Sequence, residues 1–289
     1  MRRLAAALGI VALAGTGAIG LSQEPPRPLV ILVHGRGQNG QDSAALRREW
    51  KSDLDSSLAL VGVPRLPDED VRLVWYADVM DAESDNDCRH ASAVSDSLTF
   101  GDVARGFVGF IASLAGPDDS RDVRGLMGDV LFLVDPSIRC AAEIRVGRAI
   151  EAAAREHRPV IVIAYSLGSL VTHGYLSSRD TSGTTPLRLI TVGSPLGIRP
   201  IRELVFGADV DSLRPAAGVS EWDNVYDPGD VLSAPLDGAI PRRTIRDHSA
   251  DTAADDPHNF RHYLRDRQTG EALKRALCAL RPGCRAPEH

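Results

Sequence analysis

The sequence has no excess of positive charge. Its 33 Lys and Arg residues are outnumbered by 39 Asp and Glu residues, giving a formal net charge of −6. Aromatic residues are also few, and the three tryptophans and five tyrosines are scattered rather than grouped. A nucleic-acid-binding protein usually presents a basic surface or a platform of rings on which bases stack. Neither feature is present, so we expect no nucleic-acid partner.

Cysteine is scarce as well, and its spacing does not favour zinc. The four cysteines contain no C-x-x-C pair, so zinc is a weak alternative and we expect no metal. Cys278 and Cys284 flank a Pro-Gly turn and could close a small loop, which leaves Cys88 and Cys140 as a second pair. This is one of three pairings that four cysteines allow, and disulfides are typical of exported proteins. The remaining alternative is that the thiols are free.

Only one long apolar run occurs, and it lies at the N-terminus. Two arginines are followed by an uncharged, alanine-rich stretch at 4–20, and then by a Pro-rich linker at 21–28. This order is typical of a secretory signal peptide, so we predict that 1–20 directs secretion or export to the cell envelope. The alternative is an uncleaved anchor, because Leu4–Leu21 is nearly long enough to span a bilayer.

The rest of the chain, 29–289, is predicted to form one α/β domain. Apolar runs rich in β-branched residues are typical of strands covered on both faces, and they alternate with helical segments. The pattern predicts a mostly parallel sheet with helices on both faces. The predicted strands are Leu29–Val33, Val71–Tyr76, Val160–Ala164, Leu187–Val192, Trp222–Tyr226 and Arg242–Arg246. The predicted helices are Ser43–Leu60, Ala141–His157, Leu167–Ser178 and Glu271–Leu280.

One segment, 81–139, breaks this alternation. It begins with an acidic loop and contains two apolar stretches, Phe107–Leu114 and Val130–Val134. An insertion of this kind over the edge of a sheet could be a lid that covers an apolar pocket and makes transient contact with lipid or membrane. The alternative is that these apolar residues pack the segment onto the main core.

The most informative residue is Ser166, which follows the apolar run Val160–Ala164 and precedes a helical stretch. A serine at a sharp strand-to-helix turn needs small flanking residues, which Ala164 and Gly168 supply in the pattern A-x-S-x-G. The alternative is an ordinary junction with a capping serine. We interpret Ser166 as a catalytic nucleophile.

A serine nucleophile needs a base, and the candidates are the histidines downstream of it. His173 lies within a helix and is expected to be structural. His258 lies in a loop-like stretch that could fold back over the sheet edge, and we favour it. His248, which follows the last predicted strand, is the main alternative, and His262 is the third. His258 and His262 are also four residues apart, but no glutamate follows His258 as in a zinc protease.

The acid that orients the base should follow a strand that precedes the histidine. Asp230 and Asp227 both lie in an Asp-Pro-Gly-Asp turn after the predicted strand Trp222–Tyr226. One of the two could simply shape the turn, and we assign that part to Asp227 and the orienting part to Asp230. Asp223, within the strand, is a more distant alternative.

The oxyanion of the reaction requires backbone N–H donors. One donor is expected from Leu167, the residue after the nucleophile, at the positive end of a helix. The second is expected from Arg36, in the glycine-rich stretch after the first strand, where glycines let the backbone approach a substrate. A phosphate-binding loop is the alternative for this stretch, but no Gly-Lys-Ser/Thr ending and no G-x-G-x-x-G occur.

Together these motifs resemble the α/β-hydrolase superfamily, in its serine esterase and lipase branch. The resemblance rests on Val33-His34-Gly35, on the A-x-S-x-G turn, and on the chain order serine, acid, histidine. It covers roughly 28–280, leaving out the insertion, and it implies that the family's first two strands are missing here. Alanine replaces the family's usual first glycine at position 164.

The resemblance implies an exported hydrolase that cleaves small-molecule or lipid carboxylic esters through an acyl-enzyme, without a cofactor. An acyltransferase would use the same three residues with an acceptor other than water. A catalytically inactive binding protein or a secreted peptidase would also fit the sequence, because one fold hosts many functions.

Overall fold

The computed structural model describes residues 26–35, 38, 40–80, 88, 135–178, 187–206, 218–240, 245–252 and 255–280. The predicted signal peptide lies outside these residues, as does the insertion apart from Cys88 and 135–139. The lid prediction therefore concerns a segment that lies outside the described residues. In the described ranges, none of the helices combines the length and the apolar character needed to cross a bilayer.

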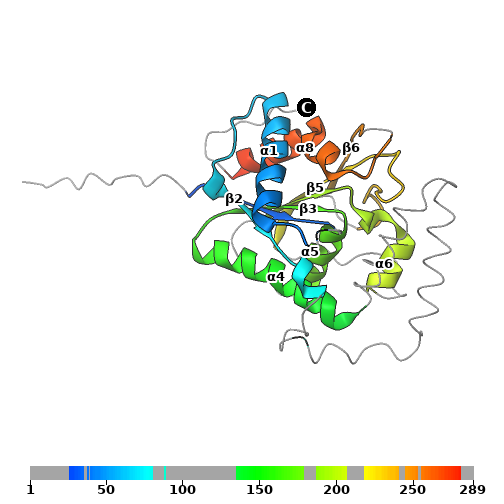
Figure 1. Cartoon of the computed structure of the whole chain (residues 1–289). Helices are drawn as coiled ribbons and strands as arrows, with labels where there is room; N and C mark the ends of the chain where they lie inside the picture. Colours follow the sequence, from blue (N-terminus) through cyan, green and yellow to red (C-terminus); the bar gives the residue numbers. More distant parts are fainter. Residues whose placement is uncertain are drawn as a thin grey trace, which may run out of the picture.

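Six parallel strands form one sheet in the order β2-β1-β3-β4-β5-β6, and helices cover both faces (Figure 1). This confirms the predicted α/β class. The strands are β1 Leu29–Val33, β2 Val71–Val74, β3 Val160–Tyr165, β4 Leu187–Val192, β5 Val219–Tyr226 and β6 Ile245–Ser249. The helices are α1 Ser43–Leu60, α4 Pro136–Arg155, α5 Leu167–Ser178, α6 Arg199–Phe206, α7 Phe260–Arg265 and α8 Arg267–Ala279. Within the described residues, short 3₁₀ turns lie at Asp68–Asp70, Ala77–Met80 and Pro195–Gly197.

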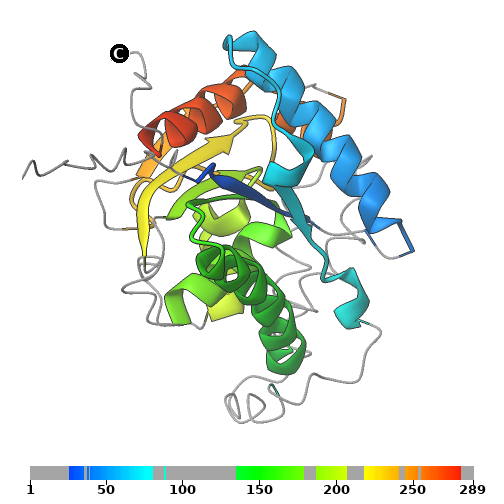
Figure 2. The ribbon, with the colours of Figure 1, turned by 90° about the vertical axis from the view of Figure 1, so that its left-hand side faces the viewer.

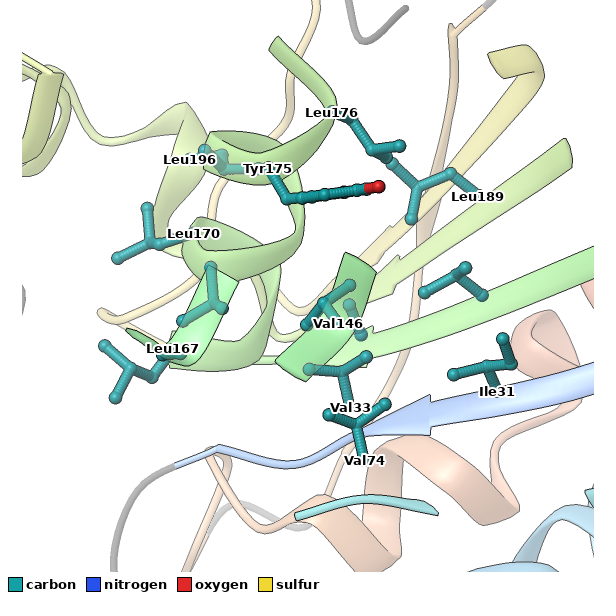
Figure 3. Packing of buried hydrophobic residues seen from close by; sticks show 14 of the residues in the cluster. Ile31, Val33, Val74, Val146, Leu167, Leu170, Tyr175, Leu176, Leu189 and Leu196 are labelled. Atoms are coloured by element: carbon teal, nitrogen blue, oxygen red, sulfur yellow. The ribbon is translucent and has the colours of Figure 1, made fainter. Parts of the chain in front are cut away.

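The inner strand β1 contributes side chains to two separate cores because successive residues of a strand point to opposite faces. Leu29, Ile31 and Val33 pack with α4 and α5, while Val30 and Leu32 pack with α1 and α8. All five residues of β1 are fully buried. Figure 2 shows α1 and α8 on one side of the sheet and α4 on the other. Figure 3 shows part of the first core, where side chains of α4 and α5 lie beside those of β1 and β4.

The strand order reverses at β1, so the carboxyl ends of β1 and β3 form the topological switch point of the sheet. From β1 the chain runs through α1 to β2 on one side, then returns through α4 to β3 on the other side of β1. The helices that follow the adjacent strands β1 and β3 therefore lie on opposite faces, α1 on one and α5 on the other. Open α/β sheets bind their ligands at such a switch point.

Two helices begin earlier than the sequence pattern indicated, and in both cases an aspartate caps the first turn. α4 begins at Pro136, so 136–139 belong to this helix rather than to the insertion. The Asp135 side chain accepts a hydrogen bond from the Ser137 amide at 2.9 Å, and proline is favoured in a first turn. α8 begins at Arg267 because the Asp266 side chain accepts from the Gln268 amide at 2.6 Å.

The last strand was predicted at the wrong residues. β6 spans Ile245–Ser249, whereas the prediction was Arg242–Arg246. It pairs with β5 on one side only, at the edge of the sheet, so its polar side chains meet solvent and give little hydrophobic pattern. His248 therefore lies within β6, opposite Val225, and does not follow the last strand.

A disulfide joins Cys88 to Cys140 in the first part of α4, as predicted. It ties the start of the insertion to the helix that follows the insertion. Cys278 is disulfide-bonded as well, and its expected partner, Cys284, lies outside the described residues.

Candidate active site

Ser166 lies at the sharp turn between β3 and α5, at the switch point of the sheet. Its φ is 50°, a left-handed conformation that costs a non-glycine residue roughly 1–3 kcal/mol. The Ser166 amide donates to the Val192 carbonyl at 3.1 Å, which ties the turn to β4. Gly168 lies so close to the end of β1 that a Cβ there would be 2.4 Å from the His34 carbonyl oxygen. Ala164 is fully buried in β3. The small residues on both sides of the serine thus occupy crowded positions.

The structure brings Ser166, His258 and Asp230 together in one chain of hydrogen bonds. His258 Nε2 is 2.8 Å from Ser166 Oγ, and His258 Nδ1 is 2.7 Å from Asp230 Oδ2. A carboxylate only accepts hydrogen bonds, so the imidazole donates through Nδ1 and its Nε2 is left to accept from the serine hydroxyl. This is the tautomer in which a histidine can take a proton from serine.

Asp230 is held by three donors in a buried position. Its Oδ1 accepts from the Leu232 amide at 2.9 Å, and its Oδ2 accepts from both His258 Nδ1 and the Tyr263 hydroxyl, each at 2.7 Å. The Asp230 side chain is 1% exposed, so the orientation of the carboxylate is set by these protein groups.

Asp227 does not contact the histidine side chain but fastens the loop that precedes it. Its Oδ1 accepts from the Gly229 amide at 2.6 Å, and its Oδ2 accepts from the amide of Thr252 at 2.6 Å and from the Thr252 hydroxyl. Burial raises the pKa of Asp227, but these hydrogen bonds outweigh it, and the pKa lies below its usual value. Asp227 thus shapes the turn, and it also anchors the segment that leads to His258.

The expected oxyanion donors are described only in part. Leu167 is the first residue of α5, and the first N–H groups of a helix have no acceptor within it. Its amide directly follows the serine, at the positive end of the helix. Arg36 lies outside the described residues. The residues before it, His34 and Gly35, are described and approach the serine closely, since a Cβ on Gly35 would be 3.1 Å from Ser166 Cβ.

His34 is a buried, neutral histidine beside this turn. The Tyr76 amide donates to His34 Nε2 at 3.3 Å, so Nδ1 carries the proton and donates to the Gly35 carbonyl at 2.6 Å. The Tyr76 ring stacks on the imidazole at 4.1 Å, and its hydroxyl donates to the His34 carbonyl at 2.5 Å. Burial lowers the pKa of His34 from 6.5 to about 4, although the bond to Gly35 opposes this effect. The imidazole therefore holds the start of the glycine-rich loop.

The remaining candidate histidines lie elsewhere. His248 Nε2 is 2.7 Å from Asp223 Oδ1 and 2.9 Å from Arg275 Nη2, in a polar cluster of β5, β6 and α8. His262 Nδ1 lies 3.1 Å from the carbonyl oxygen of Asp256.

His173, on α5, is 1% exposed, and its ring packs against those of Phe206 and Trp222. Among the residues that the structure describes, no group of three or more His, Cys, Asp or Glu side chains could hold a metal ion.

Two tyrosines that support these residues were not assigned roles from the sequence. The Tyr165 hydroxyl donates to the carbonyl of His258, and its ring packs edge-on against Trp50 of α1. Tyr263 donates to Asp230 from α7. Tyr263 lies five residues after His258, so its proximity to that histidine along the chain could be read from the sequence. Nothing local distinguishes Tyr165 from an ordinary strand residue.

A scan of protein-family models and a search of curated proteins find no match to this chain. Among solved structures, the chain is similar to the thioesterase domain of NocB from the nocardicin cluster, with 14% sequence identity and a TM-score of 0.33. The match covers 86% of this chain and 93% of that domain. A likeness at this level does not bear on the chemistry of the site.

Proposed function

We propose that this protein is an exported serine hydrolase that cleaves carboxylic esters through an acyl-enzyme. One observation carries the proposal: a serine in a strained turn at the switch point of the sheet is hydrogen-bonded to a histidine, which is bonded to a buried carboxylate. A structural serine needs neither the left-handed backbone nor the imidazole. An activated nucleophile needs a base within hydrogen-bond reach and a third group that orients the base.

The reaction follows from these contacts. His258 Nε2 accepts the proton of Ser166 as Oγ attacks the ester carbonyl, and Asp230 stabilises the imidazolium that forms. The amides of Leu167 and Arg36 donate to the developing oxyanion, and each donor in such sites lowers the barrier by about 3 kcal/mol. The intermediate then expels the alcohol, which takes the proton from His258. A water molecule releases the acid by the same steps, and no cofactor takes part.

The substrate is proposed at the level of its reacting group, an ester of a small molecule or a lipid. Export is proposed from the apolar N-terminal stretch and fits the Cys88–Cys140 disulfide, because disulfides persist in oxidising compartments. Water is the proposed acyl acceptor. Transfer of the acyl group to an added alcohol would extend the same chemistry.

Covalent labelling tests the nucleophile. The purified protein would be incubated with a fluorophosphonate probe and the adduct mapped by mass spectrometry. We expect one adduct on Ser166, lost in Ser166→Ala and strongly reduced in His258→Ala. His248→Ala is a matched control that removes a histidine outside the site, and it should label like the wild type. A folded wild-type protein that takes no label, or labels equally well in His258→Ala, contradicts the proposal.

Hydrolysis tests the substrate class. Esters of graded acyl-chain length would be assayed together with a peptide substrate, and we expect turnover of esters that Ser166→Ala abolishes. Cleavage of the peptide but not of the esters would point to a peptidase and overturn the ester assignment.

A further inference from the structure

The carboxylate of Asp230 has a second donor on the oxygen that faces the histidine. Tyr263 and His258 both bond to Oδ2, each at 2.7 Å. Tyr263 is fully buried and lies five residues after His258, on α7. The base and this tyrosine therefore approach Asp230 from the same segment of the chain.

The direction of every hydrogen bond around Tyr263 can be worked out. A phenol has one proton, and the carboxylate can only accept, so that proton is donated to Asp230. The hydroxyl oxygen then accepts from its other neighbours, which are the Asp227 amide at 3.1 Å and the Ser233 hydroxyl at 2.9 Å. The Ser233 proton has the Asp227 carbonyl oxygen, at 3.2 Å, as a second acceptor. Burial, and then the charge of Asp230, raise the pKa of Tyr263, so it stays protonated and remains a donor.

We infer that Tyr263 is a positioning residue for the proposed reaction, which sets the orientation and the effective charge of Asp230 toward His258. The inference rests on the proposed function of the three residues. The ring packs in the core beside Gly193, where a Cβ would be 3.0 Å from the ring, and phenylalanine would keep that packing. The Tyr263 hydroxyl can thus be removed without changing the packing of the ring, and its one proton is donated to Asp230.

Two consequences follow from removing this hydroxyl. The buried carboxylate would keep two of its three donors, so its plane would be less firmly oriented toward His258 Nδ1. Oδ2 would also carry more negative charge, which stabilises the protonated imidazole. The titratable groups that contact the Asp230 carboxylate are His258 and Tyr263, and Asp227 adjoins them through its amide.

The test is Tyr263→Phe, compared with Tyr175→Phe. Tyr175 is a buried tyrosine on α5 whose hydroxyl donates to Glu151 at 3.3 Å, so the control removes a hydrogen-bonded tyrosine hydroxyl elsewhere. For Tyr263→Phe we expect kcat on an ester to fall roughly tenfold, a loss of about 1.4 kcal/mol, with little change in KM. The acid limb of the pH profile of kcat/KM should move to higher pH. Tyr175→Phe should change neither.

A second readout does not depend on activity. The His258 Nδ1 proton, bonded to a buried carboxylate, should give a far-downfield proton NMR resonance that disappears in His258→Ala. In Tyr263→Phe it should move further downfield, because Oδ2 becomes the stronger acceptor. If the wild type neither labels nor hydrolyses esters, the proposed function fails. The resonance then still shows whether Tyr263 sets the effective charge of Asp230 toward His258. An unchanged resonance and an unchanged acid limb in a folded Tyr263→Phe protein would overturn the inference and leave the function standing.

A second variant covers a Tyr263→Phe protein that fails to fold. Fluorotyrosine introduced at position 263 keeps the ring and the hydroxyl but makes the hydroxyl a stronger donor. It should move the acid limb to lower pH and the Nδ1 resonance upfield, opposite to the shifts in Tyr263→Phe. A merely structural role for Tyr263 predicts no shift in either, and that result would overturn the inference.

Discussion

Acid should destabilise this protein through one buried histidine. His34 is 1% exposed, accepts a hydrogen bond from the Tyr76 amide at Nε2, and donates to Gly35 from Nδ1. Protonation at Nε2 would break the bond from Tyr76 and place a charge in the core. Burial lowers the pKa of His34 from 6.5 to about 4. Between these values the unfolded chain binds a proton at residue 34 that the folded protein does not bind.

The sign and size of the effect follow from this difference. The free energy of unfolding rises with pH wherever the unfolded state binds more protons. The contribution of neutral His34 is thus complete above a pH of about 6.5 and declines as the pH falls toward 4. The two pKa values differ by an amount equivalent to about 3 kcal/mol. About 2 kcal/mol of that is lost between pH 7.5 and pH 5.

Urea unfolding across this range can measure the loss. The matched variant is His34→Gln, whose side chain does not titrate and can still donate a hydrogen bond to Gly35. We expect the wild type to be the more stable protein at pH 7.5, and its advantage to shrink by about 2 kcal/mol at pH 5. An advantage that stays constant over the range, or an NMR titration that finds His34 protonating near 6.5 in the folded protein, would refute the reasoning.

Two further substitutions test the packing around the site. Gly168→Ala would place a Cβ 2.4 Å from the His34 carbonyl oxygen. We expect the free energy of unfolding in urea to fall by about 1–3 kcal/mol, and kcat to fall strongly. Wild-type values for both would show that α5 is not closely packed against the end of β1. Asp227→Asn weakens the hydrogen bonds from the Thr252 amide and hydroxyl. We expect the free energy of unfolding to fall by about 1–3 kcal/mol. We also expect a lower kcat, because the segment before His258 is held less firmly. A stability that is unchanged in Asp227→Asn would mean that these bonds do not anchor the segment.

The central strands could be predicted because their signal is local. A strand covered on both faces has a nearly continuous apolar run, and β1 and β4 were predicted with the bounds that the structure has. Strand β6 was misplaced because an edge strand keeps polar side chains on its exposed parts. The short helices α6 and α7 were not predicted, since helices of so few residues owe their stability to tertiary packing rather than to a periodic pattern.

The choice between candidate residues at the site depended on contacts that the sequence does not contain. Asp227 and Asp230 flank the same turn, and local chemistry suits either one to shape it. They differ in the structure because Thr252 donates to Asp227 while Tyr263 donates to Asp230. Each donor is distant along the chain from the aspartate that it meets. A choice of this kind depends on tertiary contacts, because the chain order serine, acid, histidine fits both aspartates.

The two halves of the site belong to different cores of the molecule. Ser166 precedes α5, whose residues Leu167 and Leu170 pack in the core shared with α4. His258 precedes α7, which packs with Trp50 of α1 in the core on the opposite face. The hydrogen bond from Ser166 to His258 therefore crosses the carboxyl edge of the sheet, where the two helical layers meet.

This arrangement explains why supporting residues gather on the histidine side. The serine turn is fixed by backbone geometry, because Ser166 continues directly from a central strand into a helix. His258 has no such scaffold, since it lies in a loop that begins beyond an edge strand. Hydrogen bonds from side chains replace that scaffold. Tyr165 donates to the His258 carbonyl, Asp227 accepts from the Thr252 amide, and Tyr263 donates to the Asp230 carboxylate that holds the imidazole. Single substitutions should therefore disturb the placement of His258 more readily than that of Ser166.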